Sequence, residues 1–235
     1  MAKIRGVIFV IFLVLSVLIM GPVAIFLGPF DRSGRLAHKV PRLWAKLLLK
    51  VAGVRLEVVG LEKLDPHGSY VFAANHASQF DIFALEAGLP FEIRWLAKKE
   101  LFDIPIFGHG LRAVGNIPVD RENPREGLKS LAAAAEKVKE GLCVVIFPEG
   151  TRSPDGRLLP FKPGGMVLAI KSRRPLVPLS IVGSHEVLPK GKILPRPGKI
   201  RVIIGDPIDT RAYSLRDKER LAEDLRQKIA AGLNS

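Results

Sequence analysis

The sequence predicts an α/β fold in which a mostly parallel central sheet is flanked by helices, preceded by an N-terminal two-helix membrane-associated motif. The sheet is predicted because short apolar runs alternate along the chain with helical patterns, as they do in parallel α/β sheets. The motif is predicted because apolar residues gather in the first 30 positions and a basic amphipathic pattern follows them. No repeat or low-complexity linker marks a further domain, so we expect the helix pair in residues 1–52 and one α/β domain in residues 53–235.

Residues 7–30 form a stretch of 24 residues without a charge. Its length alone predicts a membrane-spanning helix. Gly21-Pro22 divides it, because proline disrupts a helical turn, and the piece before it spans only about 21 Å of a hydrocarbon core about 30 Å thick. A kinked full span stays open, since glycine and proline are tolerated in membrane helices. A cleavable signal peptide is less favoured, because no small-x-small site follows.

A basic amphipathic pattern follows the apolar stretch. Its cations recur every three or four residues, with apolar residues and Trp44 between them: Lys39, Arg42, Lys46 and Lys50. This pattern is typical of a helix in a membrane interface, although a helix packed on the domain with a solvated lysine face would share it. We favour a monotopic helix pair that dips into one leaflet and holds the domain at the cytoplasmic face of the inner membrane. A single span with Lys3 and Arg5 inside would place the domain outside, away from activated substrates of the cytoplasm.

Seven apolar runs predict the strands, at residues 56–59, 70–74, 93–97, 117–119, 143–147, 177–182 and 200–204. Four helical patterns alternate with them or follow them, at residues 82–87, 124–139, 166–172 and 215–231. The second helix has Asn123 as N-cap, Pro124 at its first position and Glu126 where a capping box needs it. Ser214, followed three residues later by Asp217, enters the last helix. Residues 160–165 and 188–198 are rich in glycine and proline and predict loops.

The chain carries 36 Lys and Arg against 23 Asp and Glu, a formal net charge of +13. This balance favours an anionic partner: nucleic acid, an anionic membrane surface or an anionic small ligand. The sequence has no helix-turn-helix, RNA-binding aromatic motif or zinc spacing, so we expect no nucleic-acid partner. Cys143, the single cysteine, excludes an internal disulfide and lies in an apolar run typical of a core. No metal-ligand spacing joins the histidines to it or to one another, so no metal site is expected.

The segment of residues 75–81, Asn-His-Ala-Ser-Gln-Phe-Asp, follows the second predicted strand, where an open α/β sheet places its ligand crevice. Histidine has an ordinary pKa near neutrality and serves as a base at physiological pH. His76 and Asp81 would lie about 140° apart around a continuous helix, and they meet only if His76 occupies a turn and the helix begins near Ser78. Asp81 would then orient the imidazole. The alternative is that Asp81 only caps the helix and His76 is an ordinary loop histidine.

The segment of residues 147–153, Phe-Pro-Glu-Gly-Thr-Arg-Ser, lies at the end of another predicted strand. Gly150 permits a tight turn or close approach of a ligand. Arg152 can fork onto a phosphate, and Glu149 can accept hydrogen bonds from hydroxyls. A solvent loop with a local Glu–Arg pair would explain the charges but not their place at a strand end. Lys98 and Arg121 are further candidate phosphate ligands, although surface charge would explain either one alone.

These segments resemble, in order, the motifs of the glycerolipid acyltransferases, and among them the 1-acyl-sn-glycerol-3-phosphate acyltransferases. The first motif, Asn-His-x₄-Asp, is similar to Asn75, His76 and Asp81. The second, a glycine, an apolar segment and Asp-Arg, resembles residues 115–121, with a departure around Pro118. The third matches residues 147–153 without change, and the fourth, a valine-proline run, resembles residues 177–179. A Phe-Lys-x-Gly element is seen at residues 161–164, and the family's two-helix membrane motif resembles residues 7–52.

The resemblance implies transfer of a fatty acyl group from a thioester to the sn-2 hydroxyl of lysophosphatidic acid, which gives phosphatidic acid. His76 is then the base, Asp81 steadies the imidazolium, and base catalysis of this kind contributes ~10²–10⁴-fold. The predicted substrate-binding residues are Asn75, Lys98, Arg121, Glu149, Gly150, Thr151 and Arg152. Acyl-CoA and acyl carrier protein are both open as donors, and no bound cofactor is implied. The alternatives are an acyltransferase of the same family for another lysolipid, and a non-catalytic membrane lipid-binding protein.

Overall fold

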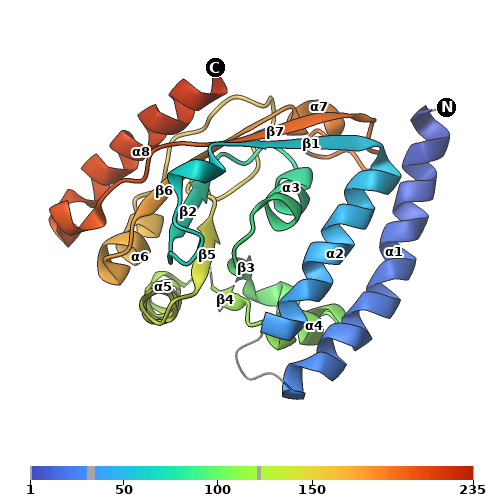
Figure 1. Cartoon of the computed structure of the whole chain (residues 1–235), viewed down its shortest axis with the longest axis horizontal. Helices are drawn as coiled ribbons and strands as arrows, with labels where there is room; N and C mark the ends of the chain where they lie inside the picture. Colours follow the sequence, from blue (N-terminus) through green and yellow to red (C-terminus); the bar gives the residue numbers. More distant parts are fainter. Residues whose placement is uncertain (1, 31–34, 121–122, 235) are drawn as a thin grey trace.

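The computed structural model describes residues 2–30, 35–120 and 123–234, and these form one mixed sheet with helices on both faces (Figure 1). The strand order is β1-β7-β6-β2-β5-β3-β4. Neighbouring strands run parallel except β6 and β7, which pair antiparallel. Their bounds are β1 Val54–Val59, β2 Val71–Ala74, β3 Ile93–Lys98, β4 Ile117–Val119, β5 Cys143–Ile146, β6 Leu176–Val182 and β7 Gly198–Ile204. The predicted fold class and all seven predicted strands are confirmed.

Two hydrophobic clusters pack the helices against the sheet. The helices are α1 Ala2–Leu27, α2 Arg35–Ala52, α3 Phe80–Gly88, α4 Phe107–Ala113, α5 Pro124–Lys139, α6 Gly164–Ser172, α7 Ser184–Val187 and α8 Lys218–Leu233. One cluster joins the sheet to α1, α2 and α3, and the other joins it to α5, α6 and α8. Strand β2 shows the two-residue alternation that this needs, since Phe72 and Ala74 face the first cluster while Val71 and Ala73 face the second.

The four predicted helices are present, and two short helices were missed. The Asn123 side chain caps α5 as expected by accepting from the backbone N–H groups of Arg125 and Glu126. Ser214 and Asp217 form the expected capping box, around a short 3-10 turn that precedes α8. Helices α4 and α7 were not predicted, because α4 contains two glycines in seven residues and α7 has only four residues.

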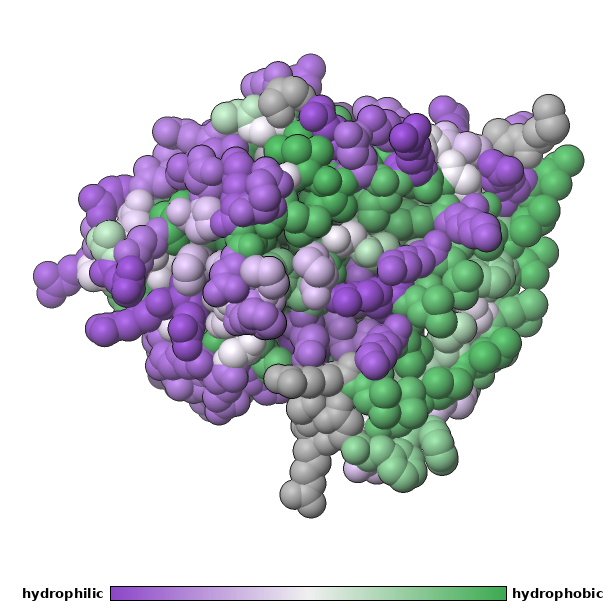
Figure 2. Space-filling view, in the orientation of Figure 1, coloured by the Kyte–Doolittle hydropathy of each residue, from purple (hydrophilic) through white to green (hydrophobic). Residues whose placement is uncertain are grey.

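Helix α1 continues through Pro22, so the expected interruption at this residue is wrong. Its 26 residues extend about 39 Å at the rise of an α-helix. Within the described residues, one segment, Lys3–Phe30, is long and apolar enough to cross a membrane, although a buried core helix or a signal sequence meets the same criterion. Most of its large side chains are exposed (Figure 2). They include Ile4, Val7, Ile8, Ile11, Val14, Leu15, Leu18, Ile19, Val23 and Phe26.

Helix α2 connects α1 to the α/β domain. Its Trp44 Nε1 donates to Ser16 Oγ on α1 at 2.7 Å, and Leu48 is buried in the core cluster shared with α3. Arg42 does not share the basic face that the pattern predicted, because its guanidinium donates to the backbone oxygens of Leu89 and Phe91 at 2.9 and 2.6 Å. The predicted lysine face of α2 is exposed and consists of Lys39, Lys46 and Lys50.

Candidate active site

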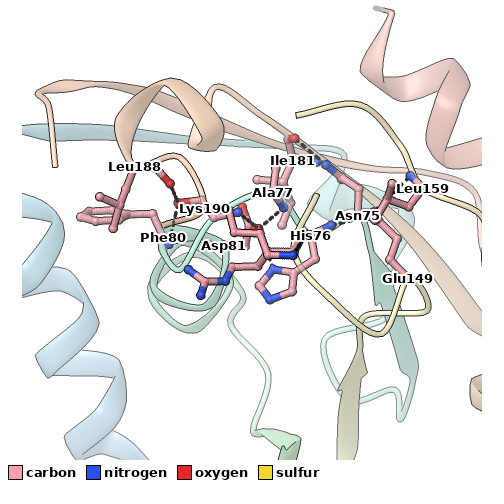
Figure 3. Close-up of polar contacts among 12 residues, drawn as sticks. Asn75, His76, Ala77, Phe80, Asp81, Glu149, Leu159, Ile181, Leu188 and Lys190 are labelled. Atoms are coloured by element: carbon pink, nitrogen blue, oxygen red, sulfur yellow. Dashed lines mark hydrogen bonds and ion pairs between the residues drawn. The ribbon is translucent and has the colours of Figure 1, made fainter. Parts of the chain in front are cut away.

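His76 and Asp81 meet at the carboxyl end of β2 (Figure 3). Because β2 ends at Ala74 and α3 begins at Phe80, His76 occupies the turn between them. Its Nδ1 lies 2.8 Å from Asp81 Oδ2, so the predicted contact is confirmed. Asp81 is fully buried, while the imidazole keeps 13% of its side-chain surface exposed. The carboxylate therefore orients the ring through Nδ1, and Nε2 is the nitrogen left for a substrate.

The Asp81 carboxylate also holds the turn that carries His76. Its Oδ2 accepts from the backbone N–H groups of Ala77 and Ser78, both at 2.8 Å. The Ser78 hydroxyl donates to the Leu188 carbonyl oxygen and accepts from the Phe80 N–H. One carboxylate thus holds both the imidazole and the backbone of the turn before α3, and the N-cap side chain of α3 makes no capping hydrogen bond.

Glu149 fastens the second segment to the first. Its Oε1 accepts from the backbone N–H of His76 at 2.6 Å, and its Oε2 accepts from the backbone N–H of Leu159 at 3.1 Å. The side chain is buried, and burial raises the pKa of its carboxyl group to about 7. Both carboxylate oxygens of Glu149 thus accept from backbone N–H groups, one in the turn after β2 and one in the loop after β5. The sequence alone did not predict this arrangement.

Asn75 ties the same turn to the neighbouring strand. Its side-chain amide donates to the Ile181 carbonyl oxygen at 3.0 Å and accepts from the Ile181 N–H at 2.7 Å. The backbone N–H of Ser153 also donates to the carbonyl oxygen of His76, at 2.7 Å. Strand β6 and the turn after β5 therefore both fix the backbone of the histidine.

Cations surround the glycine turn after β5. Gly150 has a φ of +72°, which favours glycine, and a Cβ there would meet three side-chain atoms of Lys162 at 3.2 Å. From the loop after α7, Lys190 Nζ donates to the Arg152 carbonyl oxygen at 2.8 Å and to Thr151 Oγ1 at 3.2 Å. Lys162 belongs to the Phe-Lys-x-Gly element, but no sequence signal pointed to Lys190.

The remaining predicted phosphate ligands come from β3 and from the segment after β4. Lys98 ends β3, borders the same cavity as His76 and Gly150, and lies 3.6 Å from a carboxylate oxygen of Glu100. Arg121 lies outside the described residues. No group of three or more His, Cys, Asp or Glu side chains in the described parts of the chain could hold a metal ion.

The imidazole of His76 belongs to a stack of three rings, with those of Phe147 and Trp95. The Phe147 ring lies on the imidazole of His76, with ring centroids 3.9 Å apart and planes 11° from parallel. Trp95 also stacks on Phe147, with ring centroids 5.8 Å apart and planes 23° from parallel. The indole N–H of Trp95 donates to Glu86 Oε2 at 2.8 Å, and Glu86 belongs to α3, the helix that also carries Asp81.

A cavity of about 520 Å³ extends from His76 to the N-terminal helices. Its volume is in the range of small-molecule sites. Most of its wall is apolar, with side chains from α1, α2, α3, β3 and α4 that include Leu13, Val17, Trp44, Phe83, Leu96 and Phe107. An extended apolar group therefore fits this space better than a polar one.

Comparisons with known proteins agree with this fold. The Acyltransferase family model matches residues 55–182, which include the His–Asp pair at the carboxyl end of β2, so the chain is of the acyltransferase class. The crystal structure of the 1-acyl-sn-glycerophosphate (LPA) acyltransferase PlsC from Thermotoga maritima superposes with a TM-score of 0.84 at 27% identity. That match covers 100% of this chain and 97% of the other.

Sequence relatives narrow the class to one family. The 1-acyl-sn-glycerol-3-phosphate acyltransferase of Bacillus subtilis is 37% identical over 78% of this chain and 90% of its own length. The chloroplast enzyme BAT2 of Brassica napus is 34% identical over 99% of this chain. This chain spans 68% of BAT2 and 65% of the Arabidopsis thaliana enzyme LPAT1, about two thirds of each plant protein. The chain belongs to the 1-acyl-sn-glycerol-3-phosphate acyltransferase family.

Proposed function

We propose that His76 is the general base of an acyl transfer from a thioester to the sn-2 hydroxyl of lysophosphatidic acid. The reaction follows from the family to which the chain belongs: it is a lysophosphatidic acid acyltransferase, which makes phosphatidic acid. The contact between His76 Nδ1 and the buried Asp81 carboxylate carries the assignment of the base, because it leaves Nε2 for the substrate hydroxyl.

The acyl transfer requires one base and forms no covalent intermediate with the protein. The hydroxyl oxygen attacks the thioester carbonyl carbon while its proton moves to Nε2 of His76. The tetrahedral intermediate collapses, the C–S bond breaks, and Nε2 of His76 passes the proton to the departing sulfur, which leaves as a thiol. Asp81 stabilises the imidazolium that exists between these two proton transfers. A thiolate is a good leaving group, so attack by the hydroxyl needs no prior acylation of the protein.

Glu149 and Asn75 support the reaction through the backbone of His76. Sequence reasoning assigned both to the substrate, and their contacts support positioning roles for both. Glu149 holds the His76 N–H, and Asn75 holds the preceding residue against β6. The glycerol group would then lie against the open Nε2 side of the imidazole.

Cations bordering the glycine turn bind the phosphate of the acceptor. Arg152 offers a planar fork of N–H groups suited to a phosphate. Lys98 borders the cavity that contains His76. Arg121 keeps its predicted role as a ligand. Lys190 holds the Arg152 carbonyl oxygen and so fixes the turn from which the guanidinium projects.

The apolar cavity holds a fatty acyl chain, and the N-terminal helices hold the protein at a membrane surface. Residues 1–52 act as a monotopic anchor, with the α/β domain of residues 53–235 at the cytoplasmic face of the inner membrane. The exposed apolar side chains of α1 and the exposed lysines of α2 support contact with an anionic bilayer. The donor is an acyl-CoA or an acyl-acyl carrier protein.

The proposal is tested by measuring thiol release from oleoyl-CoA, and separately from oleoyl-acyl carrier protein, by the purified protein in detergent. Lysophosphatidic acid is compared with lysophosphatidylcholine, and the wild type with His76→Ala. We expect release with lysophosphatidic acid and the wild type, and a fall of at least ~10²-fold in the variant. Substantial activity of His76→Ala, with its circular dichroism unchanged, would remove His76 as the base. A preference for lysophosphatidylcholine would mean that the protein acylates another lysolipid and not lysophosphatidic acid.

A further inference from the structure

The aromatic ring of Phe147 covers one face of the imidazole that we assign as the base. The two ring planes are nearly parallel and their centroids are 3.9 Å apart. At the same time, His76 Nδ1 is bonded to Asp81. The face of an aromatic ring carries negative electrostatic potential and attracts a cation placed within about 6 Å of its centroid. Phe147 is therefore placed to act on the charge that appears when His76 accepts a proton.

We propose that Phe147 is a positioning residue whose ring face stabilises the imidazolium form of His76 during acyl transfer. The inference rests on the proposed function, because it requires His76 to take the hydroxyl proton. The neutral imidazole gains only stacking from the ring, whereas the imidazolium also gains a cation–π interaction. Since the charge develops in the transition state, the interaction lowers the barrier more than it strengthens ground-state binding.

The surrounding contacts hold the Phe147 ring in place. Trp95 stacks on Phe147 with centroids 5.8 Å apart and planes at 23°, and its indole N–H donates to the buried Glu86 carboxyl group. Strands β3 and β5 pair in parallel with Trp95 opposite Val145, which brings the indole beside Phe147 at the end of β5. Helix α3 supplies both Glu86 and Asp81, so one helix anchors the ring stack at one end and the base at the other.

Other charged groups also act on the imidazole. Asp81 of α3 bonds to its Nδ1, and Glu149 bonds to the backbone N–H of His76. Of the nearby cations, Lys98 of β3 borders the cavity that contains His76. The others lie at the glycine turn after β5: Arg152, Lys162 and Lys190. A test must therefore change only the electrostatic potential of the ring face of Phe147 and leave all of these charged groups in place.

Fluorination of the ring provides such a change, because it withdraws negative potential from the ring face while keeping the shape of phenylalanine. We would replace Phe147 with 4-fluoro-, 3,5-difluoro- and 3,4,5-trifluorophenylalanine and measure kcat and KM for lysophosphatidic acid. We expect kcat to fall with each added fluorine, by roughly 5- to 30-fold across the series, with KM nearly constant. The ascending limb of kcat/KM against pH should move to lower pH in the same order.

The matched control is the same series at Phe91, a buried core phenylalanine that contacts the rings of Tyr70 and Phe72 and lies outside the site. Fluorination at Phe91 should leave both the rate and the pH profile unchanged. Phe147→Tyr should keep most of the activity and Phe147→Leu should lose it. A flat fluorine series at position 147 would overturn the inference even if His76→Ala is inactive. Activity in His76→Ala would overturn the proposed base and this inference together.

Discussion

Burial favours the neutral forms of two ionisable side chains that line the cavity. His38 Nε2 lies 3.2 Å from Glu86 Oε1, and both side chains are almost wholly buried. Burial, followed by the nearby guanidinium groups of Arg94 and Arg42, lowers the pKa of His38 to about 3. Burial raises the pKa of Glu86 to about 7. The two shifts have opposite effects on the pH dependence of the free energy of unfolding.

The Glu86→Gln variant separates these effects. The folded state holds a proton on Glu86 that the unfolded state releases above pH about 4.5, so this group makes the protein less stable as pH rises from about 4.5 to 7. His38 binds a proton only in the unfolded state between about pH 3 and 6.5, so it makes the protein more stable as pH rises there. The Glu86→Gln variant should therefore keep only the contribution of His38, which makes the protein more stable as pH rises.

We expect the stability of Glu86→Gln relative to the wild type to increase between pH 5 and pH 7.5, by on the order of 1–3 kcal/mol. The measurement is the thermal unfolding midpoint of both proteins at the two pH values in one detergent. Glu62→Gln, a change at an exposed carboxylate, is the control and should show no such trend. A constant difference between Glu86→Gln and the wild type would contradict the protonated state of Glu86.

At the residue scale, the sequence predicted the pairing of His76 with Asp81 but not the roles of the residues around it. The pairing was predictable because both residues lie in one short segment and only a turn lets them meet. Glu149 and Asn75 bond to backbone groups 73 and 106 residues away in the chain, respectively. Such contacts depend on strand order, which no local pattern contains.

The elements themselves could be predicted where one local signal dominated. Buried strands were recognised by their continuous apolar runs, and α5 by its cap and proline. Helix α4 was not, because its glycines give it little intrinsic helix preference and it forms against α1 and the 3-10 turn Lys99–Asp103. The antiparallel pairing of β7 with β6 also has no sequence signal, because it is decided by where the chain returns to the sheet.

The glycine turn after β5 gives a prediction at the scale of the element. Lys190→Met removes the ammonium group that donates to the Arg152 carbonyl oxygen and the Thr151 hydroxyl. The turn should then hold Arg152 less firmly, and KM for lysophosphatidic acid should rise roughly 5- to 10-fold with a smaller change in kcat. Steady-state kinetics with a saturating donor measures both values.

The control for this prediction is Lys192→Met, which removes the same charge from an exposed position two residues further along the loop. Lys190→Arg should recover most of the affinity, because its guanidinium can donate to the same oxygens. An unchanged KM in Lys190→Met, or an equal rise in Lys192→Met, would mean that Lys190 contributes only general surface charge.

On the scale of the whole molecule, the N-terminal helices are both part of the core and a surface for lipid. Phe9, Ala45 and Leu48 belong to the same cluster as the strands, so deleting residues 1–52 would uncover the core as well as remove an anchor. The exposed face of α1 can instead be changed without touching that cluster. Ile11 and Leu18 lie two turns apart on this face, each with about half of its surface exposed.

The double variant Ile11→Asp/Leu18→Asp should therefore weaken membrane binding and spare the chemistry. Two carboxylates in the interface replace apolar burial and repel anionic lipid, so co-sedimentation with vesicles containing anionic phospholipid should fall roughly tenfold or more. Thiol release in detergent micelles should stay within about twofold of the wild type, because neither side chain borders the cavity that contains His76. Leu128→Asp, at an equally exposed position on α5, should bind vesicles normally. Unimpaired vesicle binding by the double variant would show that the exposed face of α1 is not the membrane contact, whereas loss of activity in both vesicles and micelles would show that α1 shapes the active site.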